Sequence, residues 1–191
     1  MDEHELVGLL KQKDRHAFKL IVEKWQDMVF NTSLGIVQNF EDAEDLSQEV
    51  FIKVFESITS FKEEAKFSTW LYRITVSKCL DHLRSKKSRK RFAFLKSLYG
   101  GDNEMIIDPP DFFHPGVKME NKENAARLFK ALDQLPDTQK VAFVLNKIEG
   151  LRYDEVAEVL DLSSSAVDGL LQRAKKNLQN QLKNYYSAFK D

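Results

Sequence analysis

Aromatic and basic side chains alternate along one stretch of the chain in a way that suits nucleic-acid chemistry. They are Phe61, Lys62, Lys66, Phe67, Trp70, Tyr72 and Arg73, and a basic cluster follows over residues 84–91. Aromatic faces can stack on unpaired bases while cations hold phosphates, so this combination favours binding of single-stranded or opening DNA. The spacing of Trp70 also fits a residue of a hydrophobic core, and the basic cluster also fits a solvated surface.

An acidic group precedes this stretch. It consists of Glu41, Asp42, Glu44, Asp45 and Glu49, with Gln48 among them. A metal or acid–base site would need converging ligands, but no histidine lies nearby in the sequence and no glycine marks a calcium loop. Negative charge is favoured in the first turns of a helix, and the remaining charge makes a surface suited to a basic partner. We therefore predict no metal, no cofactor and no catalytic residue.

A third group lies in a segment with the spacing of a helix-turn-helix. Residues 153–160 and a longer segment that begins near residue 164 are both apolar-periodic, and Ser163 is placed to cap the second helix. The apolar positions of this second helix are Val167, Leu171, Ala174 and Leu178. Helical geometry then turns outward Ser165, Asp168, Gly169, Gln172 and Lys176, with Arg173 on the flank. Such side chains suit a DNA major groove, although an ordinary helical hairpin would show similar apolar spacing.

Further helices must position these three groups. Apolar residues recur at intervals of three and four over residues 18–29, 43–58 and 70–85, and short connections favour one antiparallel bundle. The periodicity fails over residues 92–122, where glycine and proline pairs interrupt it, and returns from residue 123 onward. The sequence therefore predicts an all-α protein with two small helical domains, residues 1–91 and 123–191, joined by a flexible linker, residues 92–122.

The composition agrees with this fold class. The 191 residues are 42% hydrophobic and 31% charged, and they include only 7 Gly and 4 Pro, which favours helices over a turn-rich β fold. The single cysteine, Cys79, excludes an internal disulfide. The N-terminal residues do not resemble a signal peptide and no stretch reaches transmembrane length, so we expect a cytoplasmic protein without stable membrane insertion.

Two motifs, in order along the chain, resemble the extracytoplasmic-function (ECF) RNA polymerase sigma factors of the sigma-70 superfamily. The likeness to their region 2 rests on residues 42–51 (DAEDLSQEVF), Phe61, residues 67–71 (FSTWL), Ile74, Asp81 and Arg84. The likeness to their region 4 rests on Leu135, Pro136, residues 150–160 (GLRYDEVAEVL), Val167 and residues 173–175 (RAK). Two independent motifs in sequence are far more specific than either alone.

The resemblance implies a subunit without catalysis of its own that binds RNA polymerase core, directs recognition of the minus-ten and minus-thirty-five promoter elements, and helps to melt DNA. The residues implied to bind the β′ clamp helices of the core are Asp42, Asp45, Gln48 and Glu49. Those implied to meet the minus-ten element are Lys62, Lys66, Phe67, Ser68, Trp70, Arg73, Ser77, Asp81 and Arg84. Region 4 would dock on the β flap and place in the minus-thirty-five major groove Ser165, Asp168, Gly169, Gln172, Arg173 and Lys176. The linker would thread the polymerase channels.

The chain departs from the family pattern at three places. Ser77 stands where Asn is frequent, Arg152 where Ser is usual, and Asp168 with Gly169 where a basic residue followed by Ser is common. Asp168 repels phosphate and can only accept hydrogen bonds, so the base contacts of the family do not transfer directly to this helix.

Two other functions fit parts of the chain. One is a stand-alone transcriptional regulator that uses only the helix-turn-helix, and the other is a helical metal-dependent hydrolase built on the acidic segment. The sequence leaves open the controlled genes, the inducing signal, the promoter sequence, the existence of an anti-sigma factor and the arrangement of the two domains in the free protein.

Overall fold

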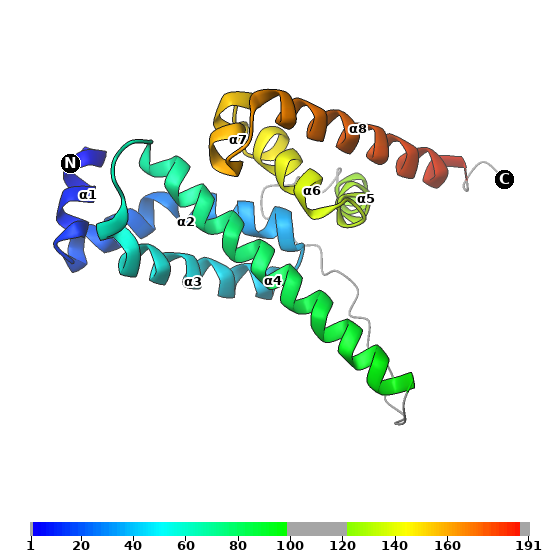
Figure 1. Cartoon of the computed structure of the whole chain (residues 1–191), viewed down its shortest axis with the longest axis horizontal. Coiled ribbons are helices and arrows are strands. Elements are labelled where there is room, and N and C mark those ends of the chain that lie inside the picture. Colours follow the sequence, from blue (N-terminus) through cyan, green and yellow to red (C-terminus); the bar gives the residue numbers. More distant parts are fainter. Residues whose placement is uncertain (1, 99–121, 188–191) are drawn as a thin grey trace.

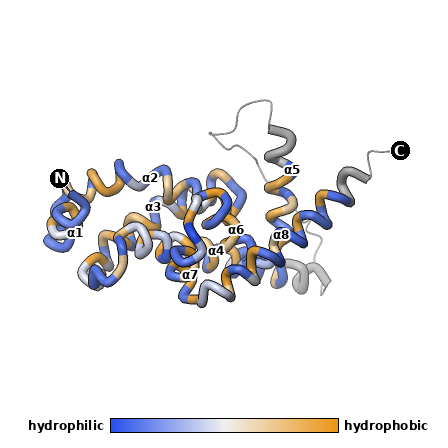
Figure 2. The backbone as a smooth tube through the Cα atoms, turned by 90° about the horizontal axis from the view of Figure 1, so that it is seen from above, coloured by the Kyte–Doolittle hydropathy of each residue, from blue (hydrophilic) through white to orange (hydrophobic). Residues whose placement is uncertain are grey.

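The computed structural model describes residues 2–98 and 122–187, and the side chains of residues 2–92 and 127–183. These residues form helices joined by short turns, with no strand among them, which confirms the predicted all-α class (Figure 1). Residues 99–121, most of the predicted linker, lie outside the described residues. Apolar and polar residues alternate along the helices in Figure 2, as packing of one helix face against a core requires.

The N-terminal domain contains four α-helices. They are α1 (Glu3–Lys11), α2 (Arg15–Val37), α3 (Phe40–Ser57) and α4 (Phe67–Leu98), with a short 3₁₀ turn, η1 (Ile58–Ser60), after α3. Asp2, Asp14 and Asn39 begin the first three helices, because each side chain accepts a hydrogen bond from a backbone N–H of the first turn. The core of this domain joins α1, α2, α3 and the start of α4.

Two features of this domain differ from the sequence prediction. Helix α1 forms over residues for which the sequence pattern predicts no helix, and it buries Leu6, Val7 and Leu10 against its neighbours. Helix α4 continues to Leu98, so the first residues assigned to the linker are helical. Lysine and arginine have high helix propensity, so the basic cluster continues the helix without an apolar stripe.

The C-terminal domain contains α5 (Lys122–Asp133), α6 (Asp137–Phe143), α7 (Tyr153–Leu160) and α8 (Ser164–Ser187), with a five-residue π-helical turn, η3 (Val144–Ile148), after α6. Gly150 follows this turn with a φ of 76°, a left-handed conformation that favours glycine. Ser163 caps α8 as predicted, because its Oγ accepts a hydrogen bond from the backbone N–H of Ala166 at 3.2 Å.

The two domains pack against each other in this structure. Helix α7 contacts α4, and both α6 and η3 contact α2 (Figure 1). One hydrophobic cluster contains residues of both domains, among them Ile36, Val76 and Val144. At Gly35 of α2 the Val144 side chain packs so closely that an added Cβ would lie 2.9 Å from its Cγ1.

Candidate polymerase and nucleic-acid interfaces

The acidic residues of α3 divide into two groups. Asp45, Gln48 and Glu49 are exposed along one side of the helix, and Glu49 Oε2 pairs with Lys78 Nζ of α4 at 2.9 Å. Ile52 continues this side and is 58% exposed, which is unusual for a large apolar residue. Ile52 is not among the residues predicted to bind core, although its position four residues after Gln48 places it on the same face.

Asp42 lies closer to the domain interior than its three neighbours. Its Oδ2 contacts His82 Nε2 at 3.1 Å and Lys86 Nζ at 2.9 Å, both on α4. Burial alone would raise the pKa of Asp42, but the hydrogen bond and charge of Lys86, with those of His82, hold this pKa below its ordinary value. Asp42 therefore ties α3 to α4 from a half-buried position, while Asp45, Gln48 and Glu49 are exposed.

An open pocket of about 450 Å³ lies along α4. Its lining residues are Lys53, Trp70, Arg73, Ile74, Ser77, Lys78 and Asp81. Four residues of the predicted minus-ten set thus meet at one hollow, together with Lys53 from α3, which the sequence analysis missed because it comes from another helix. Arg84, also in the predicted set, lies further along α4 and pairs with Asp81 at 3.0 Å.

Phe67, which is predicted to meet DNA directly, lies inside the core of the N-terminal domain in this structure. The side chain is only 2% exposed and packs against Trp25, Phe61 and Trp70, with ring centroids 6.2, 5.8 and 5.7 Å away. An aromatic ring enclosed in this way has no face to offer a base. The neighbouring cations, Lys62 and Lys66, are exposed on the loop before α4, and Ser68 is half-buried.

The outward face of α8 agrees with the sequence analysis. Val167, Leu171, Ala174 and Leu178 are buried. Ser165, Gln172, Arg173 and Lys176 are exposed, whereas Asp168 and Gly169 are half-buried. Gln172 Nε2 donates a hydrogen bond to Asp168 Oδ2 at 2.8 Å, and the Arg173 guanidinium lies close to Gly169, where an added Cβ would be 3.4 Å from Nη1. Asp168 and Gly169, which together depart from the family pattern, are thus each in contact with a residue one turn along the helix.

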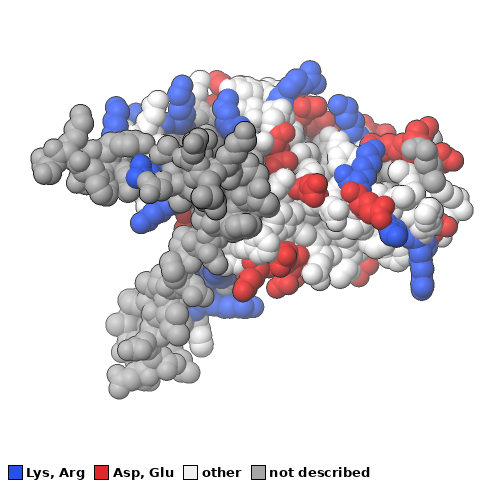
Figure 3. Space-filling view, turned by 180° about the vertical axis from the view of Figure 1, so that it is seen from behind, with Lys and Arg blue, Asp and Glu red and all other residues white. Residues whose placement is uncertain are grey.

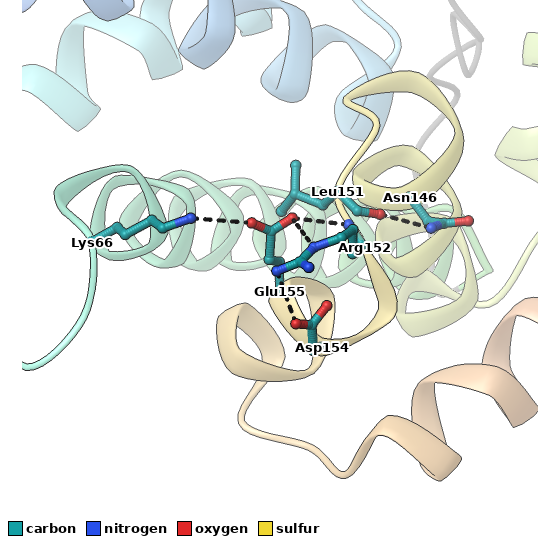
Figure 4. A network of polar contacts seen from close by, with 6 residues as sticks. All are labelled: Lys66, Asn146, Leu151, Arg152, Asp154 and Glu155. Atoms are coloured by element: carbon teal, nitrogen blue, oxygen red, sulfur yellow. Dashed lines mark hydrogen bonds and ion pairs between the residues drawn. The ribbon is translucent and has the colours of Figure 1, made fainter.

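Helix α7 covers part of the predicted minus-ten surface. Arg73 Nε and Nη2 both donate to the backbone carbonyl of Glu158, at 3.0 and 2.6 Å, and Lys66 Nζ pairs with Glu155 Oε1 at 3.4 Å. Glu155 also accepts from the backbone N–H of Arg152 at 3.0 Å (Figure 4). This hydrogen bond, followed by the charges of Lys66 and Arg152, lowers the pKa of Glu155. Nothing in the sequence indicated the contacts of Arg73 and Lys66 with α7, which join residues 85 or more positions apart.

The surface as a whole carries both signs of charge. In Figure 3, acidic and basic side chains are interspersed over one face, apart from a row of Lys and Arg along its upper edge. Among the described residues, no group of three or more His, Cys, Asp or Glu side chains is arranged to hold a metal ion. None of the described helices is long and apolar enough to span a membrane.

Two family models match the chain, in the order of the two domains. The model of Sigma-70 region 2 matches residues 21–89, and that of Sigma-70 region 4 matches residues 125–178. The ECF RNA polymerase sigma-E factor of Haemophilus influenzae is 30% identical over 95% of this chain and 96% of that protein. The ECF RNA polymerase sigma factor SigW of Bacillus subtilis is 30% identical over 91% of this chain and 93% of that protein.

Two solved structures share the fold. CnrH, in complex with the cytosolic domain of CnrY, gives a TM-score of 0.67 at 21% identity and covers 94% of this chain and 96% of its own. The sigma factor RpoE of Bartonella quintana, in complex with the anti-sigma factor NepR, gives a TM-score of 0.63 at 20% identity and covers 87% of this chain and 96% of its own. With both regions matched in order and relatives 30% identical over nearly the whole length, the chain belongs to the ECF RNA polymerase sigma factors of the sigma-70 superfamily.

Proposed function

We propose that this sigma factor binds RNA polymerase core through the exposed side of α3. Asp45, Gln48 and Glu49 provide charge and hydrogen-bonding groups, and the exposed Ile52 beside them provides an apolar contact. Protein interfaces typically place a few apolar anchors within a polar rim, which is the arrangement on this side of the helix. Asp42 contributes by holding α3 against α4, since its carboxylate is already paired with His82 and Lys86.

The pocket on α4 is the proposed site for the minus-ten element. Trp70 supplies a half-buried aromatic surface, and Arg73 and Lys78 supply cations beside it. An aromatic face with neighbouring cations suits an unstacked base and its phosphate. The aromatic cluster that contains Phe67 supports the loop that bears Lys62 and Lys66. These two cations would then lie beside the same DNA strand as the pocket.

The outward face of α8 is the proposed reader of the minus-thirty-five element. Gln172 can pair bidentately with adenine through its amide oxygen and the amide hydrogen not used by Asp168. Asp168 holds the Gln172 amide in one orientation, and its negative charge repels phosphate from this part of the helix. Arg173 and Lys176 are exposed on the same side, where they can anchor the DNA backbone.

Membership in the family supports the remaining parts of this proposal. The protein acts without catalysis of its own and works in the cytoplasm, where polymerase core and promoter DNA are found. The segment over residues 92–122 connects the two promoter-binding domains through the polymerase. The Bartonella quintana relative was solved with an anti-sigma factor, and a polypeptide of this kind is a candidate regulator of the present chain.

The matches to both region 2 and region 4 carry this proposal, and transcription with purified core tests it. The protein should give a core-dependent, promoter-specific transcript in a run-off assay. A stand-alone regulator would bind DNA but give no such transcript with core alone, and a hydrolase would do neither.

The face of α3 is tested by charge reversal. The double variant Asp45→Lys with Glu49→Lys should compete for binding to core polymerase at least about tenfold less well than the wild type. Two exposed acidic groups that match a basic partner become repulsive when they are replaced by lysine. The helical circular dichroism signal should not change, since both side chains are exposed. Normal competition by this variant would rule out this side of α3 as the core contact.

A further inference from the structure

Helix α1 packs against the connection between α3 and α4. It contacts the 3₁₀ turn η1 as well as α2. Leu6 and Leu10 of α1 are buried in the same hydrophobic cluster as Ile58 and Phe61 of the connection. The match to the model of Sigma-70 region 2 begins at residue 21, so α1 lies before the matched segment. That match therefore assigns no role to this helix.

Two cations at the end of α1 reach the connection. Lys11 pairs with Glu63 of the loop before α4, and its Nζ lies 5.8 Å from the centre of the Phe61 ring. Lys13 follows α1 and donates a hydrogen bond to the backbone carbonyl of Phe55 in the last turn of α3. Carbonyls at a helix end lack intrahelical partners and carry partial negative charge, so a cation stabilises them. The two lysines thus engage the connection on both sides of η1.

Glu63 is the loop residue on which the contacts of α1 converge. Besides its ion pair with Lys11, its Oε2 lies 2.8 Å from His4 Nδ1. The hydrogen bond from Lys11 outweighs desolvation and, with the charges of Lys11 and His4, lowers the pKa of Glu63. The backbone of Glu63 has a φ of 61°, a left-handed conformation that is unfavourable for a residue with a side chain. Such a conformation persists only where the surroundings fix it, and here α1 fixes the side chain.

The loop over residues 61–66, the minus-ten loop, carries the two cations assigned above to the minus-ten strand. Lys62 directly precedes Glu63, and Lys66 follows it by three residues, and both cations are exposed. At the start of the loop, the Phe61 ring contacts Trp70 of the α4 pocket, with centroids 5.1 Å apart. A change in the backbone direction at Glu63 would therefore move both cations relative to the pocket.

We propose that α1 positions the minus-ten loop through Glu63, so that promoter melting depends on the ion pair between Lys11 and Glu63. Lys11 and His4 also offset a carboxylate that stands between Lys62 and Lys66 and would otherwise repel the DNA strand. Lys11 and Glu63 are positioning residues, because neither needs to touch DNA. The inference rests on the proposed function in one respect, namely that this loop meets the melted strand.

Substitutions in the pair separate its role from that of the fold. Glu63→Gln removes the charge at nearly constant size, and Lys11→Glu makes the pair repulsive. The double variant Lys11→Glu with Glu63→Lys restores opposite charges in swapped order. Glu23→Gln is the matched control, because Glu23 belongs to another exposed pair, with Lys19 of α2 at 3.6 Å. One partly exposed ion pair contributes little to folding, so the free energy of unfolding should stay nearly constant.

The first measurement is the mobility of the minus-ten loop in the full chain. A spin label on Glu64→Cys is suitable because this position is exposed and the single native cysteine, Cys79, is buried. The label should become more mobile in Glu63→Gln and in Lys11→Glu, return to wild-type mobility in the swapped pair, and stay unchanged in Glu23→Gln. Equal mobility in the wild type and in Lys11→Glu would overturn the proposal.

The second measurement separates promoter binding from melting in the holoenzyme. The affinity of the closed complex should be the same for all these proteins. Permanganate reactivity of unpaired thymines should fall about two- to fivefold in Glu63→Gln, the range that one exposed ion pair supports, and further in Lys11→Glu. The swapped pair should restore it. Unchanged melting in both single variants, or a loss that the swapped pair does not restore, would also overturn the proposal.

The wild-type holoenzyme distinguishes this inference from the proposed function. If it gives no core-dependent transcript and melts no promoter DNA, the proposed function fails, and this inference fails with it. If the wild type melts the promoter and both single variants melt it equally well, only the present inference fails.

Discussion

The two proposed promoter-binding surfaces differ in what they contact within the free chain. The edge of α4 at Lys66 and Arg73 is paired with α7, whereas polar contacts on the outward face of α8, such as those of Gln172 with Asp168 and of Ser165 with Ser163, are local. The first surface is therefore partly covered by the C-terminal domain in this structure.

The largest effect is expected from Phe67→Ala. This side chain is 2% exposed in the aromatic cluster, and truncating a buried Phe typically lowers the free energy of unfolding by about 3–5 kcal/mol. Chemical denaturation should show this loss for Phe67→Ala and almost none for the exposed Lys66→Ala. Unchanged stability of Phe67→Ala would mean that the ring is not part of the core and would return it to the set of DNA contacts.

A smaller effect is expected on the outward face of α8. Gln172→Ala should relax preference at one base pair of the upstream element by about 1–3 kcal/mol, because one bidentate contact is lost. Asp168→Ala should relax the same base pair rather than a second one, since Asp168 holds the Gln172 amide. Binding-site selection with the holoenzyme measures both. Relaxation at two different positions would show that Asp168 contacts DNA directly.

Closing of the domains should depend on pH through Glu149. Burial raises the pKa of Glu149 above its ordinary value of 4.5, against the opposing hydrogen bonds from Tyr72 and Thr32. A carboxyl group whose pKa is raised when the two domains pack together stabilises that packed form. The stabilisation is complete at pH values below the ordinary pKa and is lost as pH rises through the raised pKa. The nearby Glu155 has a lowered pKa, so its contribution changes only below its own ordinary value of 4.5.

Energy transfer between fluorescent labels on Lys19→Cys of α2 and Gln179→Cys of α8, both exposed positions, measures how closely the domains pack. This energy transfer should rise as pH falls from neutral toward 4.5, the ordinary pKa of Glu149. Glu149→Gln should flatten this dependence while the domains still close. A wild-type signal that is constant over this range, or an equal slope in Glu149→Gln, would exclude Glu149 as the titrating group.

The smallest effect is expected from Lys176→Ala on α8. This exposed cation should weaken binding to all upstream sequences alike and lower the slope of log affinity against log salt by about one. A change in sequence preference without a change in slope would mean that Lys176 reads a base.

Much of the structure could be predicted from the sequence because it depends on neighbours along the chain. The apolar stripe of α8 and the Ser163 cap both rest on contacts over three or four residues. The motifs of regions 2 and 4 also lie in continuous segments, so the family could be identified before any fold was known. Helix α1 was missed although Asp2 caps it, because nine residues give little periodicity.

Only the tertiary structure decided which candidate residues are free to act. Phe67 and Lys66 are neighbours in the sequence, yet one is enclosed by aromatic rings and the other pairs with Glu155 of the second domain. Asp42 and Asp45 lie one helical turn apart, yet only Asp42 is tied to α4. Periodicity shows which face of a helix is buried, but not which distant helix covers it. The pairing of Arg73 with Glu158 spans 85 positions and depends on how two separate domains pack.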